Sequence, residues 1–95
     1  MNLVTIDDIR AAADRIHPHV VRTPLLAARW GDDERPLWVK PENLQPIGAF
    51  NVRGAFNAIA AMTATGAMPT AVVAYSSGNH AQAVAYAAAT YGLPA

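Results

Sequence analysis

The chain has 95 residues, 53% of them hydrophobic, and a formal net charge of zero at neutral pH. This composition excludes an intrinsically disordered chain and a strongly basic surface for nucleic acid or an anionic membrane. Cysteine is absent, which excludes disulfides and thiolate metal ligands. The first residues lack the basic region and apolar core of a signal peptide, and no apolar run reaches about 18 residues. We therefore expect a cytoplasmic protein without nucleic-acid or membrane partners.

The charged residues are confined to the first part of the chain. All seven acidic and all seven basic residues lie at or before Arg53, and the stretch from Gly54 to Ala95 contains no Lys, Arg, Asp or Glu. A free-standing domain normally keeps charges on its exposed faces, so this distribution indicates surfaces that other polypeptide covers. An alanine bias of a GC-rich genome is the alternative explanation.

The first half of the chain opens with an amphipathic helix. Thr5 is a typical helix cap, Asp7 and Asp8 suit a first turn, and apolar residues then recur at helical spacing. Further on, Pro24 pushes the residue before it away from the helical region. The expected elements are a helix over residues 5–17, an extended segment over 20–24, a short helix over 25–30, a solvated turn over 32–36 and a strand over 37–40.

The second half alternates apolar runs with Gly and Pro breakers. Its last helix is closed by Gly92 and Pro94. The expected elements are a loop over residues 41–49, a helix over 50–65, a break over 66–69, a strand over 70–75, a tight loop over 76–78 and a helix over 79–91.

A strand, a crossover helix and a second strand imply a right-handed parallel pair formed by residues 37–40 and 70–75. Parallel sheets normally contain more than two strands and carry helices on both faces. We therefore predict an α/β fold, an open parallel sheet with flanking helices that is incomplete within this chain. Residues 1–95 then form a single partial domain, and residues 92–95 lead toward a third strand.

In open parallel sheets, ligands bind beyond the carboxyl ends of the strands. The loop that follows residues 70–75 combines hydroxyls, a glycine, an amide and an imidazole at a helix start, which suits a carboxylate or phosphate. Ordinary helix capping is the alternative, with the histidine as a hydrogen-bonded packing residue rather than a proton carrier. The residues concerned are Ser76, Ser77, Gly78, Asn79 and His80.

The loop that follows residues 37–40 is the second candidate, and it presents residue 51. Gly48 permits a strained approach of the backbone, Phe50 offers a flat apolar face, and Asn51 lies near the first helical turn. The alternative interpretation makes Asn51 a helix cap, places Phe50 and Phe56 in the core, and gives Gly54 the role of allowing close helix packing.

Three motifs together resemble the pyridoxal-phosphate-dependent serine/threonine dehydratase and serine racemase family, which has the tryptophan-synthase-β-like fold, fold type II. The motifs are KPENLQ at residues 40–45, GAFNVRGA at 48–55 and SSGNHAQA at 76–83. The similarity extends to residues 21–25 and 37–40. It covers nearly the whole chain, but only about the first third of a family member, so it implies the N-terminal portion of a larger catalytic domain.

The resemblance assigns a role to position 51. In the family, the residue after the phenylalanine is the lysine that forms a Schiff base with the cofactor, and here it is Asn51. An amide nitrogen has no available lone pair, so it can neither form the imine nor transfer the α-proton. Lys40 is the only lysine, and we expect it to pair with an acid such as Glu42.

The resemblance implies further site residues. Phe50 packs beside the pyridine ring, Asn79 hydrogen-bonds the 3-hydroxyl of the cofactor, and Ser77 is a candidate acid/base on the face opposite the lysine. The loop that receives the substrate carboxylate consists of Ser76, Ser77, Gly78 and His80.

The function that follows is dehydration or racemisation of serine or threonine with pyridoxal 5'-phosphate, by a protein that is a homo-oligomer at full length. We expect this chain itself to be inactive, because Asn51 replaces the lysine and the family's phosphate-binding loop lies beyond the matched part. The alternative is a non-catalytic module that binds an amino acid or the cofactor, or a fragment that needs a partner chain.

Overall fold

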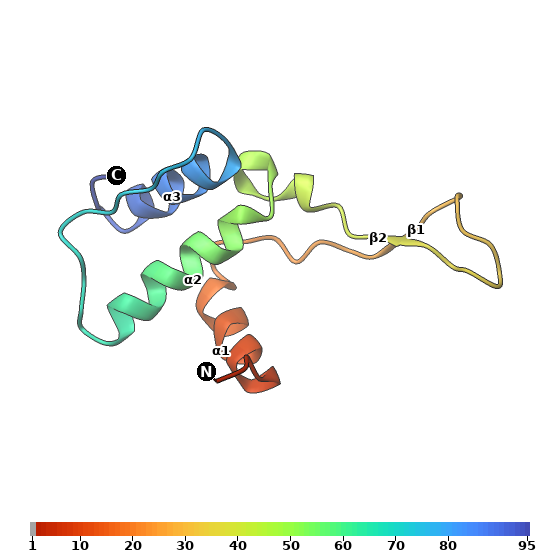
Figure 1. The fold of residues 1–95 in the computed structure, drawn as a ribbon, viewed down its shortest axis with the longest axis horizontal. Helices are drawn as coiled ribbons and strands as arrows, with labels where there is room; N and C mark the ends of the chain where they lie inside the picture. Colours follow the sequence, from red (N-terminus) through yellow and green to blue (C-terminus); the bar gives the residue numbers. More distant parts are fainter. Residues whose placement is uncertain (1) are drawn as a thin grey trace.

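Three α-helices form most of the regular structure in the computed structural model, which describes residues 2–95 (Figure 1). The helices predicted over residues 5–17, 50–65 and 79–91 are confirmed, as is the strand predicted within 37–40. The elements are α1 (Ile6–Ile16), β1 (Leu26–Ala27), β2 (Trp38–Val39), the 3-10 turns η1 (Glu42–Leu44) and η2 (Pro46–Gly48), α2 (Asn51–Ala64) and α3 (Asn79–Thr90).

Helix α1 begins with a capping box. The Thr5 hydroxyl accepts a hydrogen bond from the Asp8 amide at 3.2 Å, and the Asp8 carboxylate accepts one from the Thr5 amide at 2.8 Å. These bonds satisfy amides that would otherwise lack partners in the first turn. The hydrogen bonds from Thr5 also lower the pKa of Asp8. The cap predicted from the sequence is confirmed.

The core lies where α2 packs against α3. Val52, Phe56 and Ile59 of α2 are at most 3% exposed. The facing residues of α3, Ala83 and Ala87, have small side chains that let the two helices approach closely, and both are fully buried. Burial of apolar area is therefore the main stabilising term of this half of the chain.

The parallel pairing predicted between residues 37–40 and residues 70–75 is wrong. Strand β2 pairs antiparallel with β1, with Leu26 opposite Val39 and Ala27 opposite Trp38, rather than parallel with residues 70–75. The short helix predicted over residues 25–30 is also wrong, because this segment supplies β1.

The turn that joins the two strands gives the physical reason. The Asp32 carboxylate accepts hydrogen bonds from the amides of Glu34 and Arg35, and the Ala28 amide donates to Leu37 O at 2.9 Å. Such a side-chain-stabilised turn favours a local hairpin over a distant partner. The hairpin projects away from the three helices (Figure 1).

The strand predicted over residues 70–75 is wrong, because this segment forms no strand in the structure. The Val72 amide donates a hydrogen bond to Pro94 O at 2.9 Å, so the segments before and after α3 lie side by side. Val73 and Tyr75 are almost fully exposed. This arrangement is that of a sheet edge, with backbone groups available to a neighbouring strand.

The molecule is extended. Its radius of gyration is 15.8 Å and its principal extents are 52 × 30 × 26 Å. A compact chain of this length has a radius of gyration of about 12 Å. Within the described residues, no helix is long and apolar enough to span a bilayer.

Candidate functional site

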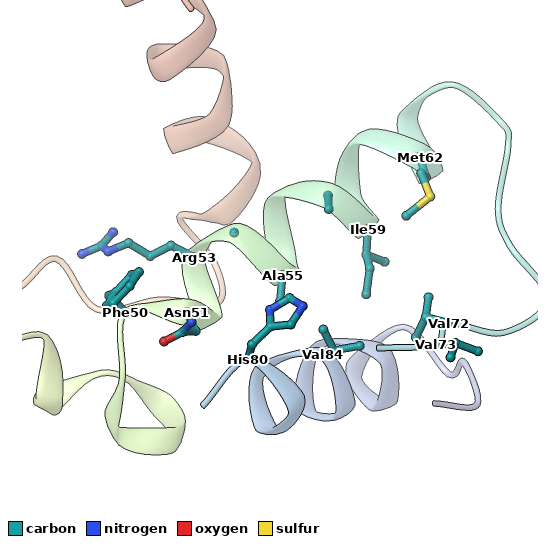
Figure 2. A pocket seen from close by; sticks show the side chains of 12 residues that line it. Phe50, Asn51, Arg53, Ala55, Ile59, Met62, Val72, Val73, His80 and Val84 are labelled. Atoms are coloured by element: carbon teal, nitrogen blue, oxygen red, sulfur yellow. The ribbon is translucent and has the colours of Figure 1, made fainter. Parts of the chain in front are cut away.

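A cavity of about 360 Å³ lies between α2 and α3, next to the extended residues 72–73. Its wall is mostly apolar and includes Ile59, Met62 and Val84. Asn51 at the start of α2 and His80 at the start of α3 bring polar groups to one end of it (Figure 2). We call this the α2–α3 cavity. A mostly apolar wall with few polar groups is typical of a small-molecule site.

A tight turn before α2 positions Asn51. Ile47 has a φ of 66° and Gly48 a φ of 75°, and the Gly48 amide donates to Gln45 O at 2.8 Å. Gly48 adopts this left-handed conformation without a steric penalty, whereas a β-branched residue such as Ile47 pays about 1–2 kcal/mol. The chain then extends through buried Ala49 and enters the helix at Phe50. The role predicted for Gly48 is confirmed.

Neither helix that opens on the α2–α3 cavity is capped by a side chain. Phe50 occupies the cap position of α2 and Gly78 that of α3, and the first turn of each helix lacks an acidic residue. The interpretation of Asn51 and of the loop at residues 76–79 as ordinary caps is therefore wrong. The Arg53 amide donates to Phe50 O at 3.0 Å, whereas among the described residues no side chain caps the preceding amides of α2 or the first amides of α3, which can therefore donate to an anion.

The alternative interpretation is also wrong in placing Phe50 in the core and in giving Gly54 a role in close helix packing. Phe50 is 64% exposed and lines the α2–α3 cavity, whereas only Phe56 is a core residue, at 1% exposed. Gly54 has no atom within 4 Å of where a Cβ would be, so it does not serve close helix packing. Phe50 thus presents its ring to the cavity.

The predicted site residues fall into two groups. Phe50, Asn51 and His80 line the α2–α3 cavity together, and the His80 side chain is exposed rather than packed inside the protein. Ser76 and Ser77 line a separate cavity, of about 490 Å³, with Ala74 and Tyr75. Asn79 begins α3 directly after Gly78. Among residues 2–95, no cluster of three or more His, Asp or Glu side chains could hold a metal ion.

Sequence reasoning missed the hydrogen-bond network around Glu42. Its carboxylate is paired with the Arg53 guanidinium and accepts hydrogen bonds from Thr23 Oγ1 at 2.6 Å and Gln45 Nε2 at 3.1 Å. The hydrogen bonds from Arg53, followed by those from Thr23 and Gln45, lower the pKa of Glu42 from 4.5 to about 2. The expected pair between Lys40 and Glu42 is wrong, because the Lys40 Nζ instead donates to Thr23 O at 2.8 Å.

Gln45 extends this network to the segment after α1. Its side-chain oxygen accepts from the Val21 amide at 2.8 Å, and Arg53 Nη2 donates to Val21 O at 3.2 Å. Gln45 is 4% exposed, so its polar groups need these partners. Because Arg53 lies in the first turn of α2, the network fixes the turn that carries Asn51. One feature of the sequence could have indicated this network: Glu42 is the last acidic residue and Arg53 the last basic residue of the chain.

Comparison with known proteins identifies the family. Residues 16–95 match the family model described as pyridoxal-phosphate dependent enzyme. The chain belongs to this family. The assignment made from the three motifs is confirmed, and with it pyridoxal phosphate as the cofactor of the family.

Curated relatives are similar over the whole chain. It is 39% identical over 97 residues to L-threo-3-hydroxyaspartate ammonia-lyase of Saccharomyces cerevisiae, a match that covers 100% of this chain and 29% of the relative. It is 45% identical over 89 residues to serine racemase of Arabidopsis thaliana, a match that covers 92% of this chain and 27% of the relative. The chain thus spans less than a third of the length of these relatives.

Solved structures show the same fold. Maize serine racemase superimposes with a TM-score of 0.84 at 43% identity, over 98% of this chain and 29% of that one. The threonine deaminase of T.th. gives a TM-score of 0.81 at 42% identity, over 96% of this chain and 32% of that one. The chain therefore has the structure of a part of the fold type II enzymes.

Proposed function

We propose that this chain is the N-terminal part of a pyridoxal-phosphate-dependent enzyme that dehydrates or racemises serine or threonine, and that position 51 no longer attaches the cofactor. The names of the relatives, among them ammonia-lyases, racemases and a threonine deaminase, support this class of substrate and reaction. The single observation that carries the proposal is the position of Asn51, which lines the α2–α3 cavity together with Phe50 and His80.

The residues present fit a cofactor that is held without a covalent bond. The exposed ring of Phe50 would lie against the pyridine ring, and the amide of Asn79 would reach the 3-hydroxyl. When bound, pyridoxal phosphate withdraws electrons from the α-carbon of an amino acid. Asn51 supplies neither an amine for attachment nor a base for the α-proton. The Lys40 amine is bound to Thr23 O and does not line the α2–α3 cavity.

The donors near the helix starts would bind the substrate carboxylate. The first amides of α2 and α3 have no side-chain caps, and the hydroxyls of Ser76 and Ser77 are exposed just before α3. Unpaired amides at a helix start carry partial positive charge, which favours an anion. Ser77 in addition would exchange a proton at the α-carbon on the face opposite residue 51, which favours serine as substrate.

Covalent capture of the cofactor tests the position of residue 51. In a Lys40→Arg background, Asn51→Lys makes residue 51 the only lysine, and the matched control retains Lys40 and Asn51. Each protein is incubated with pyridoxal phosphate, reduced with borohydride and mapped by peptide mass spectrometry. We expect residue 51 to be labelled several-fold faster than Lys40 in the control. Equal or slower labelling at residue 51 would contradict a cofactor site there.

The rival function is a non-catalytic module that binds an amino acid or the cofactor. It is favoured by the chemistry of the α2–α3 cavity, whose described lining contains no lysine. Oxo-acid formation from L-serine and L-threonine distinguishes the two when the chain is mixed with the remaining part of a relative. We expect turnover with Asn51→Lys and none with the unaltered chain. Binding without turnover in both would support the rival.

A further inference from the structure

A second cavity, of about 420 Å³, lies between the end of α1 and the start of the hairpin. It shares only Arg53 with the lining of the α2–α3 cavity. Its apolar wall includes Ile16 and Val20, and its remaining wall is charged or polar. The polar lining residues are Asp14, His17, Arg22, Lys40 and Arg53.

The charges that line this second cavity are incompletely paired. The ion pairs of the described residues are Arg10 with Asp7, Arg35 with Asp32, and Arg53 with Glu42. Arg53 is thus neutralised, but Asp14, Arg22 and Lys40 belong to none of these pairs. No nitrogen of Arg22 or Lys40 lies within 4.0 Å of an Asp14 oxygen. Opposite charges therefore line one cavity without touching each other.

The basic side chains still have donors to offer. Lys40 uses one N–H of its ammonium group on Thr23 O, which holds the group in place and leaves two. The guanidinium of Arg22 presents a planar fork that matches a carboxylate. The carboxylate of Asp14, which lines the same cavity, accepts hydrogen bonds only.

We propose that this second cavity binds a small zwitterionic α-amino acid. Arg22 and Lys40 hold its carboxylate, Asp14 holds its ammonium group, and Ile16 and Val20 contact its side chain. A simple anion would leave Asp14 without a partner and close to a like charge, whereas a simple cation would leave Arg22 and Lys40 facing a like charge. A zwitterion offers an opposite charge to Asp14 and to the two unpaired basic side chains, and the volume of the cavity suits a small ligand. The site is additional to the α2–α3 cavity.

Titration of the ¹⁵N-labelled chain with glycine and L-serine tests this proposal. We expect shifts of the amides of residues 13–22 that saturate with a Kd of about 1 mM, as is reasonable for a small ligand held by a few charged contacts. Acetate, methylammonium and inorganic phosphate serve as probes of one charge sign. We expect each to bind at least about tenfold more weakly than glycine, because each leaves either Asp14 or the basic side chains without a partner.

Variants separate the two cavities. Arg22→Ala and Asp14→Asn should each weaken glycine binding about tenfold, whereas Arg29→Ala and Asp33→Asn, which alter charges outside the second cavity, should not. His80→Ala should leave the shifts at residues 13–22 unchanged. Absence of saturable shifts there in the unaltered chain would overturn the proposal, whether or not the variants fold. Acetate or phosphate binding as tight as that of glycine, with no effect of Asp14→Asn, would also overturn it.

Discussion

The side chain of Glu42 links the segment after α1 to the start of α2. Thr23, Gln45 and Arg53 all donate to its carboxylate. Because the pKa of Glu42 is lowered from 4.5 to about 2 in the folded chain, the charged form is favoured by folding. This contribution to the free energy of unfolding is present above the unfolded pKa and is lost as the pH falls through the folded pKa.

We expect the free energy of unfolding to decrease as the pH is lowered from about 5 to about 2, and Glu42→Gln to flatten this dependence. At pH 7 the substitution should cost about 1–3 kcal/mol, since it weakens a hydrogen-bonded and partly buried ion pair. Urea unfolding at a series of pH values measures both effects. Asp33→Asn, in the exposed turn of the hairpin, is the matched control. An unchanged slope in Glu42→Gln would contradict the role given to Glu42.

Substitution of two glycines by alanine should change the stability of the chain in opposite directions. Gly48 has a φ of 75°, so Gly48→Ala should destabilise the chain by about 1–2 kcal/mol although no atom blocks the added methyl group. Gly54 lies inside α2 with open space around it, so Gly54→Ala should stabilise the chain by about 0.5–1 kcal/mol. Thermal unfolding of both variants measures the difference. Stabilisation by Gly48→Ala would show that the turn before α2 is not held in its left-handed form, and destabilisation by Gly54→Ala would contradict the open space around that position.

At the scale of elements, the extended segment before α3 behaves as a sheet edge. The Val72 amide donates to Pro94 O, and the neighbouring Val73 is 96% exposed. We therefore expect hydrogen exchange of the Val72 amide to be slowed relative to that of Val73, because only hydrogen-bonded amides must open first. NMR-detected exchange resolves the two amides. Equal rates would mean that the segments flanking α3 do not stay together in solution.

The helices could be predicted from the sequence because their signals are local. Thr5 and Asp8 form the expected cap of α1, and Gly and Pro bound the runs of residues that form α2 and α3. The hairpin could not be predicted from the same signals. Residues 25–28 are Leu and Ala, which also favour helices. The sequence predicts the turn over residues 32–36, but no local pattern shows that this turn pairs β1 with β2. The hydrogen bonds of the turn at Asp32 favour the hairpin over a helix in this segment.

The candidate site could be predicted in part for a similar reason. The motifs place Phe50, Asn51 and His80 at two helix starts, and the structure brings these residues to one cavity. The network that fixes the start of α2 could not be predicted, because Thr23, Glu42 and Arg53 are far apart in sequence and no local pattern pairs them. The specific roles of the site residues stay predictions.

At the scale of the whole molecule, the accessible surface is large. It measures 7079 Å² for a chain of 10.0 kDa, against about 5200 Å² for a compact monomer of that mass. The excess includes apolar side chains on the hairpin, of which Trp30 is 83% and Trp38 58% exposed. These surfaces, together with the charge-free second half, support the interpretation that other polypeptide covers them.

We expect the chain alone to bind a hydrophobic dye strongly and to unfold with low cooperativity, because little of its apolar surface is buried. Mixing it with the remaining part of a relative should reduce the dye fluorescence several-fold and sharpen the urea transition. A hairpin variant, Trp38→Arg, should weaken this association, whereas Arg35→Ala in the adjoining turn should not. A sharp transition and weak dye binding by the chain alone would contradict the prediction.

The separation of charged from uncharged sequence also governs how dissolved salts act on the protein. Sodium chloride screens the exposed pairs of Arg10 with Asp7 and of Arg35 with Asp32, and so weakens ion pairs within the first segments of the chain. The contact between α2 and α3 contains no such pair among the described residues. Sulfate, which is excluded from protein surfaces, strengthens that apolar contact. Ionic composition can therefore loosen one half of this chain while it tightens the other.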